Sequence, residues 1–166
     1  TVGNAGFSAS QAIFTSLAFD GSTPYVAFRE ASINKATVMK FNGTSWVNVG
    51  SPGFSAGDAE YTSLAFNGST PYVAYKDVAN NNKATVMKFN GSSWVTVGSA
   101  GFSAGSADYT TLAFNGSTPY VAYKDYGNNL KATVMKYNGS SWVNEGNAGF
   151  SAGSTTYNSI VINGSN

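Results

Sequence analysis

The same block of sequence recurs three times along the chain. The tryptophans Trp46, Trp94 and Trp142 lie 48 residues apart. Residues 54–101 differ from residues 102–149 at only ten of 48 positions. Periods of this length are typical of solenoids, arrays and propellers. We therefore expect residues 1–166 to form a single repeat domain, with units at 7–53, 54–101 and 102–149, a partial unit at 150–166 and a stub at 1–6.

Each unit contains four strand-length segments. In the second unit they are residues 63–66, 71–75, 83–89 and 93–98, with the sequences SLAF, PYVAY, KATVMKF and SWVTVG. Asn-Gly pairs separate the first segment from the second and the third from the fourth. These pairs predict type I′ hairpins, because both residues tolerate a positive φ. No stretch holds a 3.6-residue hydrophobic period for three turns, so no α-helix is expected.

Four antiparallel strands in about 40 to 50 residues are typical of a propeller blade. The apolar residues of the two middle segments do not alternate cleanly with polar ones, which indicates sheets covered on both faces, as in stacked blades. The predicted fold class is all-β: a β-propeller of four-stranded antiparallel blades, with three full blades plus one extra strand per chain. A two-sheet sandwich and a β-solenoid are the alternatives.

Both ends of the chain align with the interior of a unit. Thr1–Gly3 aligns with Thr96–Gly98, and Ser159–Gly164 aligns with Thr111–Gly116. Propellers close with four or more blades. We therefore expect the ring to be completed by oligomerisation or by missing parts of the parent protein. The expected protein partner is a second copy of the chain or the remainder of its parent.

Composition excludes several classes of function. Only 10% of the residues are charged, nine Lys and Arg stand against eight Asp and Glu, and no basic run occurs, so no nucleic-acid partner is expected. The apolar runs are too short to span a bilayer, so no membrane insertion is expected. The chain has no Cys and no His, which excludes disulfides and Cys/His metal sites. No metal or cofactor is predicted. The polar, uncharged composition favours a secreted or cell-surface location.

The repeat has the pattern WVxVGxxGFSAGxAxYTSLAFNGSTPYVAYKD. This pattern resembles repeats of bacterial secreted and surface β-propellers. Its length and its placement of Trp and Gly are similar to those of tachylectin-type and bacterial fucose-binding propeller lectins. The resemblance covers the whole chain and implies sugar sites repeated between neighbouring blades. The chain lacks the Trp-Asp ending of a WD40 blade and the paired glycines of a kelch blade.

One candidate binding site is the loop after the second segment of each unit. Lys76-Asp77 and Lys124-Asp125 lead there into runs of asparagine. A carboxylate beside several amides supplies the hydrogen-bond donors and acceptors that sugar hydroxyls need. The alternative is a solvated loop closed by Asx turns. The candidate carbohydrate ligands of these loops are Asp77, Asn80, Asn81, Asp125, Asn128 and Asn129.

The repeated tryptophans are a second candidate. An exposed indole at Trp46, Trp94 or Trp142 could stack on the apolar face of a sugar. The alternative, which the exposed edge of the fourth strand favours, is that each indole packs against the next blade.

Six Asn-Gly-Ser/Thr triplets match the pattern of N-glycosylation acceptors. Because they recur at the same two positions of the repeat, hairpin turns are the favoured interpretation. The triplets begin at Asn42, Asn67, Asn90, Asn115, Asn138 and Asn163.

No catalytic residues are predicted. A glycosidase needs two facing carboxylates, and each unit offers few: Asp58 and Glu60 in one, Asp108 in the next. The expected function is a non-enzymatic, extracellular, lectin-like propeller with repeated weak carbohydrate sites. The alternatives are a structural or self-assembling surface repeat protein, and a designed or reconstructed symmetric propeller with no small-molecule ligand.

Overall fold

The computed structural model describes residues 1–163, in which every regular strand belongs to one of three four-stranded antiparallel sheets. In each sheet the strands follow chain order, so each is a meander. Blade 1 contains β1 (Ala12–Asp20), β2 (Thr23–Glu30), β3 (Lys35–Phe41) and β4 (Trp46–Asn48). Blade 2 contains β5 (Ala59–Asn67), β6 (Thr70–Asp77), β7 (Lys83–Phe89) and β8 (Trp94–Thr96). Blade 3 contains β9 (Ala107–Asn115), β10 (Thr118–Asp125), β11 (Lys131–Tyr137) and β12 (Trp142–Asn144).

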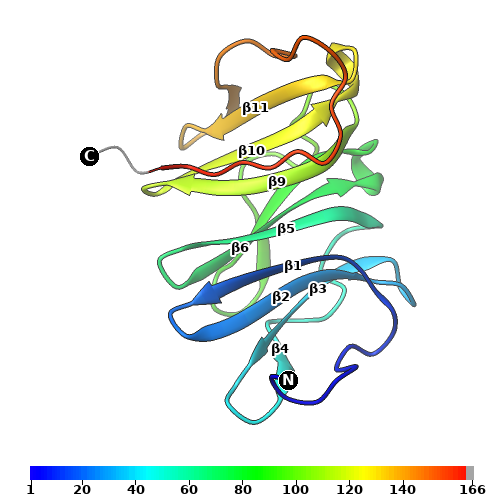
Figure 1. Ribbon diagram of the computed structural model, residues 1–166, viewed down its shortest axis with the longest axis vertical. Helices are drawn as coiled ribbons and strands as arrows, with labels where there is room; N and C mark the ends of the chain where they lie inside the picture. Colours follow the sequence, from blue (N-terminus) through cyan, green and yellow to red (C-terminus); the bar gives the residue numbers. More distant parts are fainter. Residues whose placement is uncertain (164–166) are drawn as a thin grey trace.

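The three sheets stack on one another, with their first strands β1, β5 and β9 side by side (Figure 1). Hydrogen bonds join these inner strands: Thr110 Oγ1 donates to the carbonyl of Tyr61 at 2.6 Å, and the amide of Leu112 donates to Ser63 Oγ at 3.0 Å. Sheets of four meandering strands stacked around their first strands are the blades of a β-propeller. The predicted fold class is therefore confirmed.

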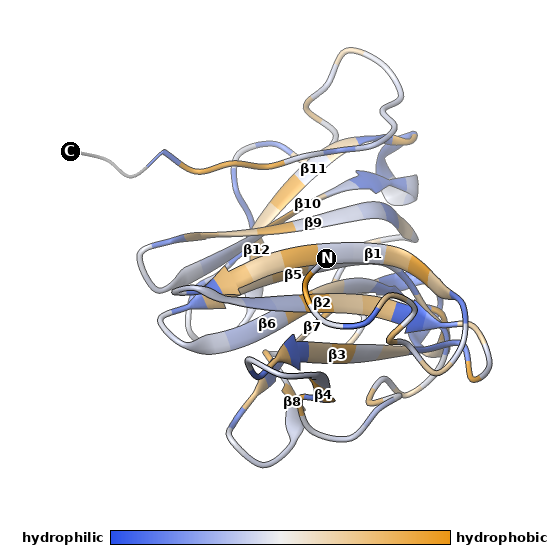
Figure 2. Ribbon diagram, turned by 60° about the horizontal axis from the view of Figure 1, so that its bottom comes forward, coloured by the Kyte–Doolittle hydropathy of each residue, from blue (hydrophilic) through white to orange (hydrophobic). Residues whose placement is uncertain are grey.

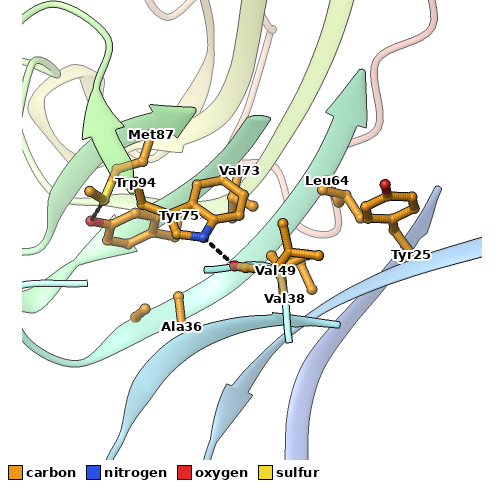
Figure 3. Close-up of a cluster of buried hydrophobic side chains, with 11 residues drawn as sticks. Tyr25, Ala36, Val38, Val49, Leu64, Val73, Tyr75, Met87 and Trp94 are labelled. Carbon is orange, nitrogen blue, oxygen red and sulfur yellow. Dashed lines mark hydrogen bonds between the residues drawn. The ribbon is translucent and has the colours of Figure 1, made fainter. Parts of the chain in front are cut away.

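The core lies between successive blades rather than within one sheet. Tyr72, Val73, Ala74 and Tyr75 are all buried, so β6 is covered on both faces. Figure 3 shows one such interface, where side chains of blades 1 and 2 interdigitate around Tyr75. Burying a side chain of this size stabilises a fold by about 1.5–3 kcal/mol. The absence of clean apolar alternation in the sequence follows from this two-sided burial.

The turn between β5 and β6 is a two-residue loop, Gly68-Ser69, because Asn67 pairs with Thr70. Gly68 has a φ of +56°, whereas Ser69 is not among the residues with positive φ. That pattern fits a type II′ turn, in which only the first central residue needs a positive φ. The prediction of a type I′ turn centred on Asn-Gly was wrong, because the asparagine is the last residue of the strand.

The turn between β7 and β8 is closed by an asparagine side chain. Asn90 Oδ1 accepts hydrogen bonds from the amides of Ser92 and Ser93 at 3.0 and 2.9 Å. This is an Asx turn over four residues and not a type I′ hairpin. Asn42 and Asn138 repeat it. Asn115 pairs with Thr118 as Asn67 does with Thr70, so the predicted turn positions are confirmed for five triplets. The sixth triplet, at Asn163, runs outside the described residues.

Residues 150–163 continue beside β9, where the first strand of a further blade would lie (Figure 1). The amide of Thr155 donates to the carbonyl of Leu130 at 3.0 Å, and the ring of Tyr157 lies 4.9 Å from that of Tyr109. No strand is formed here within the described residues. The predicted extra strand is therefore corrected to an extended segment, since the sequence contains no fourth PYVAY segment to pair with it. Figure 2 shows the hydrophobic stretch of this segment in orange, separated from the grey trace by a short blue piece, and Val161 is 91% exposed.

The connections contain two short 3-10 turns, η1 (Val78–Asn80) and η2 (Tyr126–Asn128). Among residues 1–163, no helix has the length and apolar character needed to cross a membrane.

Candidate functional site

The loops after β6 and β10 hold their carboxylates inside the protein. Asp77 and Asp125 are only 1% and 0% exposed. Asp125 accepts hydrogen bonds from the amide of Gly127, Asn128 Nδ2 and Thr133 Oγ1 at 2.8 to 2.9 Å. Asp77 accepts from the equivalent side chains, Asn80 Nδ2 and Thr85 Oγ1. These oxygens point into the loop and not toward solvent, contrary to the geometry that a ligand-facing carboxylate needs.

Two asparagines of these loops end the short turns that follow β6 and β10. Asn81 and Asn129 have φ values of +58° and +56°, and they end the short turns η1 and η2. Asparagine tolerates this left-handed conformation better than most residues do. Both side chains are exposed. A carbohydrate role for the loops stays a prediction, and only these two asparagines present an exposed side chain for it.

The tryptophans lie between blades. Trp94 and Trp142 are each 8% exposed, and their rings stack on Phe54 and Phe102 at centroid distances of 4.2 and 4.3 Å. Their indole nitrogens donate to the carbonyls of residues 49 and 97 in the preceding blade. Trp46 stacks in the same way on Phe7, at 4.4 Å, and is half-buried. The structure therefore places Trp94 and Trp142 in interblade packing, against the preceding blade and not the next. Trp46 packs against the N-terminal segment, where its indole nitrogen donates to the carbonyl of Val2 at 3.0 Å.

The carboxylates near the inner strands form an ion-pair network. Asp58 Oδ1 lies 3.0 Å from Arg29 Nε, and Lys76 Nζ lies 3.0 Å from both Glu60 Oε2 and Asp108 Oδ1. Each acid is neutralised by a neighbouring cation. Burial, together with the nearby charge of Asp108, raises the pKa of Tyr61 to about 12, so this phenol stays protonated at neutral pH. Within residues 1–163, no group of three or more acidic side chains is placed to hold a metal ion.

Two grooves between blades combine aromatic and polar side chains. The first groove lies between blades 1 and 2 and has a volume of 590 Å³. It is lined by Tyr25, Lys40, Val49, Ser69, Thr70, Pro71, Tyr72, Lys88, Phe89, Asn90 and Gly91. The second groove lies between blades 2 and 3 and has a volume of 460 Å³. It is lined by Tyr72, Lys88, Val97, Ser117, Thr118, Pro119, Tyr120, Lys136, Tyr137, Asn138 and Gly139.

The two linings are equivalent position by position. One wall comes from the earlier blade, which supplies a tyrosine of its second strand and a lysine of its third. The opposite wall comes from the later blade, through its Ser-Thr-Pro turn, a lysine and an aromatic-Asn-Gly turn. Tyr72 and Lys88 belong to both grooves. The tyrosines and lysines of the grooves recur at equivalent positions of each repeat. The sequence analysis did not single them out, because tyrosine and lysine are also ordinary residues on the surface of a strand.

Packing fixes the tyrosines in place. Tyr25 meets Phe66 edge to face with ring centroids 4.9 Å apart, and Tyr72 meets Phe114 in the same way at 4.9 Å. Such aromatic pairs are worth about 0.5–1.5 kcal/mol beyond area burial. Both tyrosines are largely buried, so ligand binding would cost no further loss of their side-chain entropy. The grooves are therefore largely preformed, as ligand sites usually are.

A third groove is only half built. Blade 1 presents Ser22, Thr23, Pro24, Lys40, Phe41, Asn42 and Gly43 around a hollow of 430 Å³. These residues are equivalent to those that the later blade contributes to the first and second grooves. No earlier blade supplies the tyrosine wall within the part of the chain that the structure describes.

A row of aromatic rings lines the inner strands. Phe14, Tyr61, Tyr109 and Tyr157 follow one another at 4.7 to 4.9 Å, and all four have φ between +52° and +55°. Bulky residues rarely adopt this conformation. The first three sit at the irregular points in the pairing of β1, β5 and β9. Sequence reasoning missed this feature, because a bulge leaves no mark in composition or spacing.

No protein-family model matches the sequence, and no curated protein matches it. Solved structures do match the fold. A fucose lectin from Kordia zhangzhouensis in complex with methyl-fucoside superposes with a TM-score of 0.54 at 13% identity. The match covers 81% of this chain and 99% of the lectin chain. The resemblance to bacterial propeller lectins in fold is therefore confirmed.

Two glycoside hydrolases are also similar in fold. A family-43 enzyme engineered to show both endo-xylanase and exo-arabinofuranosidase activity has a TM-score of 0.51 at 13% identity. The match covers 84% of this chain and 31% of the enzyme. A thermostable family-43 glycoside hydrolase has a TM-score of 0.51 at 15% identity, with 80% and 49% of the two chains covered. At these identities the similarity concerns the backbone alone.

Proposed function

We propose that this protein binds carbohydrate in the first and second grooves and carries out no reaction on it. The observation that carries this proposal is the repetition of one lining at two blade junctions. A preformed hollow with aromatic walls and a few convergent polar groups is the usual form of a small-ligand site. Repetition of a weak site suits a ligand that itself repeats, because linked sites bind with higher avidity.

The chemistry of the lining suits a sugar. Tyr25 and Tyr72 contribute the small exposed parts of side chains that are 7% and 9% exposed, and Asn90 and Thr70 supply further polar groups. Sugar rings have apolar C–H faces and many hydroxyls, which match ring surfaces and mixed donors and acceptors. Similarity in fold to a fucose lectin bound to methyl-fucoside adds support.

The acidic residues support a binding rather than a catalytic role. Hydrolysis of a glycosidic bond needs one carboxyl that donates a proton and a second that acts as nucleophile or base. Asp58, Glu60 and Asp108 are engaged with Arg29 and Lys76 near the inner strands. Among residues 1–163, no carboxylate belongs to the lining of either groove.

We also propose that a further blade of the same kind covers the free face of blade 1, and that a second copy of this chain supplies it. Leu17 is 60% exposed on this face, whereas the equivalent Leu64 and Leu112 are each 6% exposed beneath the preceding blade. Phe19 adds a second exposed apolar side chain, at 56%. A further blade would also complete the half-built groove. The weakly charged composition supports a secreted or cell-surface setting.

Binding to a glycan array, followed by calorimetric titration of the best ligands, tests the function. The Lys88→Met variant should lose at least about tenfold in affinity, because Lys88 lines both grooves. The matched control is Lys83→Met, which makes the same change at the opposite end of β7 and should bind normally. The absence of glycan binding in the unmodified protein would refute the proposal and favour a purely structural, self-assembling repeat protein.

A further inference from the structure

The charges of the two grooves are of one sign. Lys40 and Lys88 line the first groove, and Lys88 and Lys136 line the second. In the part of the chain that the structure describes, neither lining includes an Asp or Glu. Every other cationic side chain lies at or beyond the opposite end of the strands, where most of the carboxylates are. The first groove is thus the place where this weakly charged protein offers two cations that form no ion pair among the described residues.

The lysines of the first groove are not engaged elsewhere. Among residues 1–163, neither Lys40 nor Lys88 forms an ion pair. Lys40 Nζ lies 5.9 Å from the centre of the Tyr25 ring, above the aromatic wall of the groove. Asp20 also lies at this end, where its Oδ1 accepts a hydrogen bond from Ser69 Oγ of the groove lining. An anion in the groove would meet two ammonium groups, each with free donors.

The second groove differs in one respect. Lys136 Nζ lies 2.7 Å from Glu145 Oε2, and this hydrogen bond raises the pKa of Lys136. Blades 1 and 2 have Val49 and Val97 at the position of Glu145. The second groove therefore carries less positive charge than the first, because the carboxylate of Glu145 already pairs with Lys136.

We propose that the carbohydrate bound in these grooves is anionic, with a carboxylate or sulfate group held between the lysines of adjacent blades. This inference rests on the proposed carbohydrate-binding function and names its ligand class. The aromatic wall would take the sugar ring, and the ammonium groups would take the charge. Lys88, shared by both grooves, is the main specificity-determining residue.

The test is an array of matched pairs in which a neutral sugar stands beside its acidic form. Suitable pairs are galactose and galacturonate, glucose and glucuronate, and N-acetylglucosamine and its 6-sulfate. In the pairs that bind, the acidic member should bind at least about tenfold tighter at low salt, and the ratio should fall severalfold at high salt as the charges are screened. Comparing the affinities for the uronates with that for the 6-sulfate shows which anionic group the grooves prefer.

Lysine variants test the location. Lys88→Gln should bring the acidic-to-neutral ratio close to one, Lys88→Arg should keep it, and Lys83→Gln should leave it unchanged. Glu145→Val, which restores the residue of the other two blades, should raise the affinity for acidic sugars severalfold by freeing Lys136. Thermal melting confirms that each variant is folded.

The outcomes separate this inference from the function on which it rests. Binding of neutral sugars as tightly as acidic ones would overturn the anionic ligand and leave carbohydrate binding standing. A preference for acidic sugars that survives Lys88→Gln would overturn the groove lysines as its cause. Failure to bind any member of any pair would overturn both proposals.

Discussion

The indole nitrogen of Trp94 donates a hydrogen bond of 2.8 Å to the backbone carbonyl of Val49, across the junction of blades 2 and 1 (Figure 3). Trp142 makes the same bond to Val97 at 2.7 Å. Each tryptophan thus ties its blade to the end of the preceding one. The regular spacing of tryptophan in the sequence reflects this joint between blades.

Trp94→Phe should lower the free energy of unfolding by about 2 kcal/mol. The change leaves the buried carbonyl of Val49 without its donor, and an unsatisfied buried polar group costs about 1–3 kcal/mol. Chemical denaturation measures the loss. A variant as stable as the unmodified protein would show that the hydrogen bond between blades contributes little.

Asp125→Ala should lower the free energy of unfolding by about 3 kcal/mol, because three donors lose their buried acceptor. Asp77→Ala should cost less, since Asp77 has two of these bonds and its Oδ1 has no donor among the described residues. Denaturation of the two variants under the same conditions gives the difference. Equal or reversed losses would contradict this account of the loops.

Gly91→Ala should cost about 1 kcal/mol in stability. Its φ is +100°, which strains any residue with a Cβ, although a Cβ there would meet no atom within 4 Å. Gly153→Ala is the matched control, because its surroundings are equally open and its φ is not in the positive range. Thermal melting compares the pair. A loss of the same size in both variants would rule out backbone strain at the turn.

The chain should sediment at a multiple of its 17.2 kDa mass at micromolar concentration. Leu17→Lys should reduce the mass to that of the monomer, because it places a charge on the exposed face of blade 1. Val78→Lys, a change at an exposed apolar residue away from that face, is the control. A compact monomer in the unmodified protein would contradict the proposed association of two copies.

The fold was largely predictable from the sequence. Strand segments and turn positions follow from the repeat, because Asn-Gly turns and apolar runs are local signals. The type of turn was not predictable, since it depends on whether Asn67 pairs with Thr70 across the hairpin. The αL conformation of Tyr61 at an irregular strand pairing leaves no local signal either.

The candidate site was the harder part. Asp77 and Asn80 form a plausible polar ligand set in sequence, but the fold turns the carboxylate inward against Thr85, which is eight residues away. The grooves join Tyr25 to Lys88, side chains from different repeats. Only the stacking of the blades brings them together, so no pattern within one repeat reveals them.

The central claim is that a saccharide binds between blades. Its most direct test is an isotope-labelled NMR titration of the protein with the best glycan from the array. The account predicts that the resonances of Tyr72, Lys88 and Thr118 shift with a common saturation curve, while those of Asn81 and Asn129 do not move. Shifts confined to the asparagine loops, with the groove residues unaffected, would contradict it.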